Sequence, residues 1–168
     1  MIGRPKRAIF ALGVIAAVLG LDRLTKLAAI EMLAGTPPRD LAGGLIRLLY
    51  QENHGAMLSL GADLPESIRF LFFGVMVMVV LTGLLLFVLW KPVVGRAEVW
   101  AAALVIGGGF GNVIDRWFFD GAVIDFINVG IDGVRTGVFN LADVSILAGV
   151  IVFVLRRTIK PQFVDSHQ

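Results

Sequence analysis

The sequence predicts an all-α membrane protein, a bundle of four transmembrane helices with a small cap outside the membrane in which short β-strands are plausible. Hydrophobic residues make up 57% of the 168 residues and charged residues 17%, whereas soluble domains are typically ~45–50% apolar and ~25% charged. The apolar residues also lie in long blocks, close to the ~20 residues that a membrane-spanning helix requires. Only helices or closed barrels can cross a bilayer, and these blocks are too long and continuous for barrel strands.

Four apolar blocks predict the four spans, at residues 8–30, 68–90, 97–114 and 140–155. The first block is interrupted near its end by Asp22, Arg23 and Lys26, and its basic start followed by an apolar stretch also fits a cleaved signal peptide. The sequence offers no convincing small-x-small cleavage site before Asp22, and the apolar character resumes after Lys26. We therefore expect a retained first helix.

Basic residues are distributed unevenly among the segments that flank the spans. The stretches GRPKR, KPVVGR and RRTIK contain eight of the 15 basic residues, and only two of the 13 acidic residues lie on that side. Because loops rich in Lys and Arg stay in the cytoplasm, both termini should be cytoplasmic, and the longer connections, 31–67 and 115–139, should be external. Basic residues scattered over helix ends also argue against a nucleic-acid partner.

The two longer connections carry weaker structural signals. Residues 45–51, LIRLLYQ, include β-leaning residues in an amphipathic order, so short strands on the membrane surface are plausible there. The second connection has turn signals at Asp120-Gly121 and Asp132-Gly133. There is no internal repeat, and a single domain covering residues 1–168 is the simplest interpretation.

Polar residues gather at the outer ends of the predicted helices. Spacings of three or four residues place on common helix faces Asp22 with Lys26, Asn112 with Asp115 and Arg116, and Asn140 with Asp143. Asp125, in the apolar stretch VIDFI, and Asn53, in ENHGAM, lie in the outer connections. Ionisable groups at membrane level are rare and usually functional, so this concentration at one boundary indicates a site.

Each of these residues also has a structural interpretation. Asp22 with Lys26 can be an ion pair that anchors a helix end, Asn140 can be a helix cap, and Asp143 can favour the positive end of its helix. His54 fits a surface or hydrogen-bonding role better than a metal ligand. With two His and no Cys in the chain, no closed set of metal ligands is available, and we expect neither a metal nor another cofactor.

Glycines in the third helix predict close helix packing. Gly107 and Gly111, continued backward by Ala103, form a small-xxx-small pattern that lets a neighbouring helix approach. The same GGGFG stretch could suggest a phosphate-binding loop, but no Lys-Ser/Thr follows it and it lies inside a predicted helix.

Asp125 and Asp143 are the candidate catalytic residues. Asp143 lies about one turn inside the fourth helix, roughly 5 Å below its start, and Asp125 reaches the same level if VIDFI folds back over the bundle. Two carboxylates in a low-dielectric cleft cannot both ionise easily, so one keeps a proton near neutral pH. Such a pair can activate water and protonate a leaving amine. Ser59, Ser67 and Ser145 lack a paired base.

Five motifs run in order along nearly the whole chain: DRLTK (22–26), NHGAM (53–57), GNVIDR (111–116), VIDFI (123–127) and FNLAD (139–143). In these motifs the chain resembles the bacterial lipoprotein signal peptidases, also called type II signal peptidases. The resemblance implies an aspartic endopeptidase of the inner membrane that removes signal peptides from prolipoproteins after the cleavage-site cysteine has received diacylglycerol. It also implies inhibition by globomycin-type peptides.

The resemblance assigns roles to individual residues. Asp125 and Asp143 match the catalytic pair. The matching substrate-binding or supporting residues are Asp22, Lys26, Asn53, Gly55, Asn112, Asp115, Arg116 and Asn140. Asn112 and Asn140 can donate amide hydrogens to the carboxylates or to an oxyanion, and Arg116 can offset the acidic charge or hold a substrate carbonyl.

Two departures from the family pattern bear on substrate preference. Met57 and Leu58 stand where a small residue and then Phe are usual, and Arg23 stands where Gln is frequent. We expect these residues to touch the pocket wall more than the chemistry.

A different functional class is a small transporter or ion-channel subunit that uses the acids as a cation path. Carboxylates near the midplane and repeated half-helices would favour that class, and the sequence shows neither. A structural scaffold would leave the carboxylates unexplained. The expected partners are a prolipoprotein signal peptide with a lipid-modified cysteine and membrane lipids, and the chain is expected to be a monomer.

Overall fold

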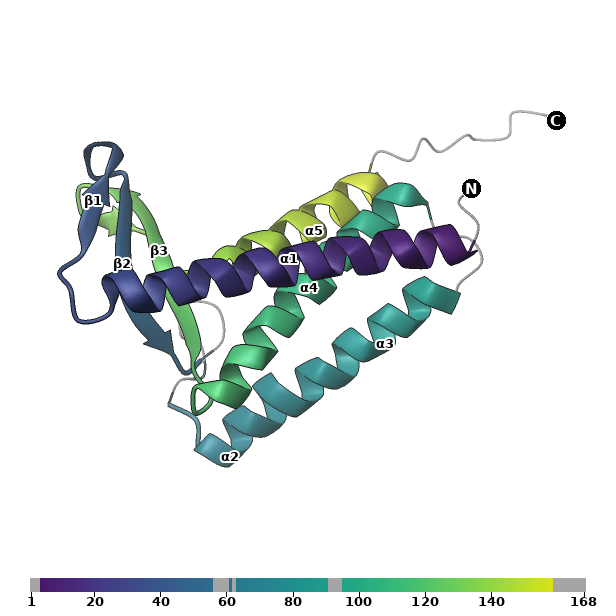
Figure 1. Cartoon of the computed structure of the whole chain (residues 1–168), viewed down its shortest axis with the longest axis horizontal. Helices are drawn as coiled ribbons and strands as arrows, with labels where there is room; N and C mark the ends of the chain where they lie inside the picture. The colour runs from purple at the N-terminus through teal and green to yellow at the C-terminus, as the bar shows by residue number, and fades with distance from the viewer. Residues whose placement is uncertain (1–3, 56–60, 62, 91–94, 159–168) are drawn as a thin grey trace.

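The computed structural model of the chain describes residues 4–55, 61, 63–90 and 95–158. In chain order the elements are α1 (Arg4–Leu33), β1 (Arg39–Leu41), the 3₁₀ turn η1 (Ala42–Gly44), β2 (Ile46–Asn53), α2 (Glu66–Arg69), the π-helical segment η3 (Phe70–Met76), α3 (Val77–Trp90), α4 (Arg96–Phe118), β3 (Val123–Ile131), β4 (Val134–Arg135) and α5 (Leu141–Thr158). Figure 1 shows the long helices side by side with the strands at one end. The start of α1 and the end of α5 lie at the other end.

Three helices of the described chain are long and apolar enough to cross a membrane: Pro5–Leu33, Glu66–Trp90 and Arg96–Phe118. The second is one continuous rod formed by α2, η3 and α3. The 18 residues of α5 include Asp143, Arg156 and Arg157, and these three charges lower its apolar character. The prediction of a mostly helical membrane protein is confirmed with three candidate spans, and the fourth span stays a prediction.

The strands form a small antiparallel sheet in the order β1-β2-β3-β4. β2 covers the stretch where a strand was plausible from the sequence. β3, nine residues long, occupies a segment for which only turns were expected. Its first four residues are all buried, so the alternation of apolar and polar residues that marks a half-exposed strand is absent.

The expected turns flank β3 on both sides. Asp120 and Gly121 precede it with φ of 49° and 83°, and Asp132 and Gly133 follow it with φ of 45° and 87°. These are left-handed conformations that Gly adopts freely and Asp tolerates better than most residues. The turn prediction is therefore confirmed at both places.

The sheet rests on the last turns of α1. Ala29 and Leu33 of α1 pack against Phe126 of β3 in one buried cluster, with Leu48 and Ile127 at its edge. This contact fixes the height of β3 relative to the helices, and with it the position of Asp125.

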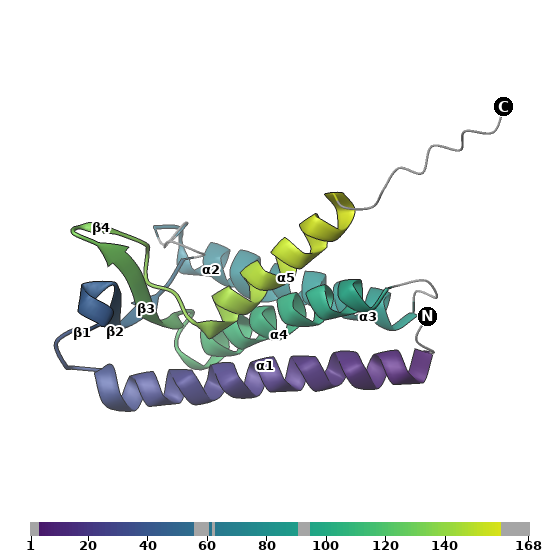
Figure 2. The same ribbon diagram turned by 90° about the horizontal axis from the view of Figure 1, so that it is seen from above.

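α4 is the central helix and contacts α1, α3 and α5. In Figure 2, α1 runs along one side of α4 and α5 crosses on the other. A Cβ on Gly107 would lie 2.8 Å from the Cβ of Val18, and a Cβ on Gly111 would lie 2.6 Å from a carboxylate oxygen of Asp22. Both glycines therefore admit α1, as the small-xxx-small pattern predicted.

Candidate active site

A cleft of about 460 Å³ opens between β3 and the start of α5. Asp125 of β3 and Asp143 of α5 both line it. The full lining is Asn53, Asn112, Arg116, Val123, Asp125, Val129, Thr136, Gly137, Val138, Phe139, Asp143, Val144 and Leu147. The two carboxylates therefore face one space whose remaining wall is mostly apolar.

The first turn of α5 holds Asp143 through a reciprocal cap. The backbone N–H of Asp143 donates to Oδ1 of Asn140 at 3.0 Å, and the backbone N–H of Asn140 donates to Oδ2 of Asp143 at 3.2 Å. This is the geometry of a capping box, in which both ends of a first turn satisfy each other. The interpretation of Asn140 as a helix cap is therefore confirmed.

The side-chain amides of Asn140 and Asn112 link the two carboxylates. Nδ2 of Asn140 donates to Oδ1 of Asp125 at 2.7 Å and to Oδ1 of Asn112 at 3.2 Å. Nδ2 of Asn112 donates to Oδ1 of Asp143 at 2.9 Å. An amide orientation is fixed by what its oxygen accepts, so the chain Asp125–Asn140–Asn112–Asp143 sets both acids from one network.

Asn53, the last residue of β2, holds Asp125 from the opposite side. Its Nδ2 donates to Oδ2 of Asp125 at 2.9 Å, while its Oδ1 accepts the backbone N–H of Gly55 at 3.0 Å. The second bond points the amide nitrogen toward the carboxylate. Both oxygens of Asp125 therefore accept neutral amide donors.

The pKa of Asp125 is raised to about 6, chiefly because burial disfavours the charged carboxylate. The hydrogen bond from Asn53 opposes this rise, the charge of Asp143 adds to it, and Asn140 and Lys26 oppose it in turn. Asp125 is only 1% exposed. Asp125 is thus poised to exchange a proton near neutral pH.

Arg116 reaches the cleft from the last turn of α4. Its Nη2 donates to the carbonyl oxygen of Gly55 at 2.8 Å, and its Nη1 donates to the carbonyl of Asn112 at 3.2 Å. Its guanidinium carbon lies 5.6 Å from the ring centre of Phe73 in the π-helical segment η3. These contacts hold a positive charge beside the two acids without a direct ion pair to either within the described chain.

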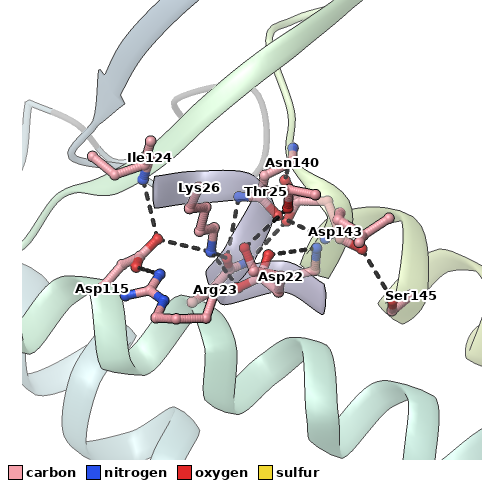
Figure 3. A network of polar contacts seen from close by, with 12 residues as sticks. Asp22, Arg23, Thr25, Lys26, Asp115, Ile124, Asn140, Asp143 and Ser145 are labelled. Carbon is pink, nitrogen blue, oxygen red and sulfur yellow. Dashed lines mark hydrogen bonds and ion pairs between the residues drawn. The ribbon is translucent and has the colours of Figure 1, made fainter. Parts of the chain in front are cut away.

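Lys26 of α1 connects this network to a second group of acids. Its Nζ lies 2.8 Å from Oδ2 of Asp22 and 2.7 Å from Oδ2 of Asp115, and it donates to Oδ1 of Asn112 at 3.0 Å. The last bond turns the Asn112 amide nitrogen toward Asp143. Figure 3 shows Lys26 between Asp22 and Asp115.

Asp22 and Asp115 are fully buried and bind backbone amides as well as cations. Oδ1 of Asp22 accepts the backbone N–H of Ala142 in α5 at 3.0 Å. Oδ2 of Asp115 accepts the backbone N–H of Ile124 in β3 at 3.2 Å. The two acids therefore tie α1 to α5 and α4 to β3.

All ten residues that the sequence singled out lie at the sheet end of the helices, joined directly or through one another. Arg23 is different from the expectation. It does not line the cleft but pairs with Oδ1 of Asp115, because Asp115 of α4 faces α1 and also pairs with Lys26 there. Ser145 donates to the carbonyl of Leu141 at 3.0 Å, which turns it into its own helix. Met57, Leu58 and Ser59 lie outside the described residues.

Sequence reasoning missed the apolar wall of the cleft. Val129, Val138, Phe139 and Leu147 line it, yet nothing distinguishes them in sequence from residues that face lipid or core. No three His, Asp or Glu side chains of the described ranges come together in a way that could hold a metal ion.

Comparisons with known proteins find relatives of this chain. A family model described as signal peptidase (SPase) II matches residues 14–159. The chain is 33% identical over 135 residues to a lipoprotein signal peptidase of Treponema denticola, covering 76% of each chain. It is 32% identical over 158 residues to one of Mycobacterium avium, covering 90% of this chain and 80% of the relative.

The fold is also similar to solved structures. A bacterial membrane enzyme determined by the in meso method at 2.3 Å resolution superposes with a TM-score of 0.78 at 23% identity, covering 95% of this chain and 93% of the other. A second such structure, at 1.9 Å resolution, gives the same TM-score at 24% identity. The family model spans most of the sequence, and from its match we conclude that the chain belongs to the signal peptidase II family.

Proposed function

We propose that the chain is an aspartic endopeptidase that removes signal peptides from prolipoproteins whose cleavage-site cysteine carries diacylglycerol. Its membership of a peptidase family supports the reaction class, and relatives named lipoprotein signal peptidase support the substrate class. The observation that carries the aspartic mechanism is that Asp125 and Asp143 line one cleft and are linked through Asn140 and Asn112.

The reaction would use one ionised and one protonated carboxyl. The ionised acid takes a proton from a water molecule as its oxygen attacks the scissile carbonyl carbon, and the protonated acid gives its proton to the carbonyl oxygen. The acid that took the proton of water then gives it to the leaving nitrogen, the other acid takes back a hydroxyl proton of the tetrahedral intermediate, and the C–N bond breaks, which restores the starting state of both acids.

The neutral amides suit this cycle because they tolerate both protonation states. Asn53 and Asn140 donate to Asp125, and Asn112 donates to Asp143. A cation in direct contact would hold an acid in its ionised form, whereas an amide stabilises that form more weakly. Arg116 stands close enough to balance charge that develops on the intermediate.

The apolar wall of the cleft suits a lipidated substrate. Val129, Val138, Phe139, Val144 and Leu147 line the same space as the acids. Burial of acyl chains against such a surface contributes about 0.8 kcal/mol per methylene group. We infer that these residues meet the apolar part of the substrate while the acids meet its peptide bond.

We propose that α5 is the fourth span and that residues 1–168 form a single domain, a monomer, in the bacterial inner membrane. The sheet and the acids would form a cap at the outer face, with both termini in the cytoplasm. The charge distribution supports this orientation, as does the position of the start of α1 and the end of α5 away from the sheet (Figure 1). No metal or other cofactor is invoked.

The central test replaces each acid by its amide. Asp125→Asn and Asp143→Asn should each lower the cleavage rate of a purified lipidated prolipoprotein by roughly 10²–10⁴-fold, since an amide cannot shuttle the proton. Asp132→Asn, in the exposed turn after β3, is the matched control and should cleave at the wild-type rate. Equal yields and elution profiles in detergent would show that the variants are folded. Cleavage at the wild-type rate by Asp125→Asn or by Asp143→Asn, the two variants of the catalytic dyad, would refute the mechanism.

Topology can be tested independently of activity. A reporter fused after Gln168 should be active on the cytoplasmic side, and one inserted near Asp63 should be active outside, because four spans return the chain to the side on which it started. A control fusion at Asp132 should also be external. An external C-terminus would mean an odd number of spans and would remove α5 from the membrane.

A further inference from the structure

Asp115 is the point at which three elements are tied together. The acid belongs to α4, and its side chain is fully buried. Its Oδ1 pairs with Arg23 of α1, and its Oδ2 pairs with Lys26 of α1 at 2.7 Å and accepts the backbone N–H of Ile124 at 3.2 Å. In Figure 3 the three partners approach Asp115 from separate directions.

The number of charges in this cluster makes Arg23 necessary for its neutrality. Asp22 and Asp115 are two buried carboxylates, and Lys26 is a single ammonium shared between them. The same ammonium also donates to Asn112 at 3.0 Å. One cation cannot balance two acids, and uncompensated buried charge is strongly unfavourable. Arg23, whose side chain is 32% exposed, supplies the second positive charge from the rim.

The cluster reaches both catalytic acids by separate paths. Asp115 holds the amide of Ile124, the residue that immediately precedes Asp125 in β3. Lys26 orients Asn112, which donates to Asp143 at 2.9 Å. A change in the ion pairs of Asp115 therefore affects the positions of Asp125 and Asp143 without a direct contact to either.

We propose that Arg23 is a positioning residue of the active site: by pairing with Asp115 it leaves Lys26 shared with Asn112 and neutralises the acids behind the dyad. The inference rests on the proposed function, because it concerns the same reaction. Without Arg23, Lys26 is the single cation of the cluster that balances both acids, its bond to Asn112 weakens, and a net negative charge remains behind Asp125 and Asp143.

The expected readout is the pH dependence of cleavage. The charged or titratable groups around Asp115 and the dyad are Asp22, Arg23 and Lys26 from α1, Tyr50 from β2, Arg116 from α4, Asp125 from β3 and Asp143 from α5. Loss of a positive charge from this set disfavours ionisation of both acids. Both limbs of the bell-shaped profile should therefore move to higher pH.

The experiment compares Arg23→Gln, Arg23→Lys and the control Arg47→Gln in the full-length protein. Arg47 of β2 makes an exposed ion pair with Asp40 of β1, at 2.7 Å, so its replacement removes an Arg–Asp pair outside the cluster. Arg23→Gln should lower kcat severalfold, leave KM unchanged, and shift both limbs upward by roughly half a pH unit. Arg23→Lys should keep the wild-type profile, and Arg47→Gln should match the wild type throughout.

Amide hydrogen exchange at Ile124 gives a second readout that does not depend on activity. Arg23→Gln should accelerate it, because Asp115 then holds the Ile124 N–H less firmly, and Arg47→Gln should not. An unshifted profile with unchanged exchange in Arg23→Gln would overturn the proposal, as would an effect confined to KM. If Arg23→Gln fails to fold, Arg23→Lys decides: a wild-type pH profile with wild-type exchange at Ile124 supports the role of the positive charge, and a shifted profile or faster exchange despite the retained charge opposes it. Full activity of Asp125→Asn would instead refute the proposed function and leave the exchange result standing.

Discussion

Two pairs of aspartates lie close together at the sheet end of the helices, and they differ in what holds them. Asp22 and Asp115 contact cations, Lys26 and Arg23. Asp125 and Asp143 contact side-chain amides and one backbone N–H. Three of the four acids are at most 1% exposed, so burial alone does not separate the pairs. The two pairs differ in the chemistry of their partners, which are cations for the first pair and amide groups for the second.

This difference fits a structural role for Asp22 and Asp115 and the proposed chemical role for Asp125 and Asp143. A cation-paired acid is a fixed cross-link, since removing either partner leaves a buried charge. An amide-bound acid can gain or lose a proton while its neighbours stay in place. Lys26 and Asn112 stand at the boundary, because their mutual hydrogen bond joins the two pairs.

The largest expected effect comes from removing the shared cation. Lys26→Met should lower the free energy of unfolding by about 3–5 kcal/mol, because two buried carboxylates lose their common partner. Unfolding in detergent micelles measures this. Lys6→Met, an exposed site in the same helix, is the matched control and should change little. Equal stability of the two variants would mean that Asp22 and Asp115 are not held by charge.

The second effect is a pH dependence of stability that Asp125 should contribute. The pKa of Asp125 is raised from 3.8 to about 6, so folding disfavours its ionised form. Its contribution to the free energy of unfolding should therefore fall by about 3 kcal/mol as the pH rises from about 4 to about 6, and stay lower above that.

Asp125→Asn removes this titration, so the stability difference between variant and wild type should shift in favour of the variant by that amount between about pH 4 and about pH 7. Taking the change with pH cancels any fixed cost of placing an amide opposite Asn53 and Asn140. Asp132→Asn is the control. A difference that is the same at both pH values would mean that Asp125 is not held in a low-dielectric setting.

The smallest effect concerns the close packing of α1 against α4 beside Asp22. Gly111→Ala should destabilise the fold by about 1–3 kcal/mol, because the new Cβ would lie 2.6 Å from Oδ2 of Asp22. Gly13→Ala, in α1 with nothing within 4 Å of its Cβ, should be neutral or slightly stabilising. If both variants unfold alike, α1 can shift away from α4 without cost, and the pairing of Asp22 is looser than the distances imply.

The site was predictable in outline because its residues are polar in an apolar sequence. GNVIDR and FNLAD stand out for that reason, and helical spacing already placed Asn112 with Asp115 and Asn140 with Asp143 on common faces. The length of β3 was not predictable, since a strand buried at its start lacks alternation. The partner of Arg23 was not predictable either, because spacing within α1 does not reveal which residue of α4 lies opposite. The π-helical segment η3 left no signal that the sequence patterns could detect.

The pairing of Asp22 with Lys26 within one helix bears on how the chain enters the bilayer. α1 is synthesised first, before α4 and α5 exist to receive its polar side chains. An isolated helix with one unpaired charge inserts poorly, but an acid and a base one turn apart, 2.8 Å between their charged atoms, cancel each other in advance. Lys26 can then take on Asp115 and Asn112 when α4 arrives, without leaving Asp22. The ion pair that supports the site in the folded protein would thus first favour the insertion of α1 into the membrane.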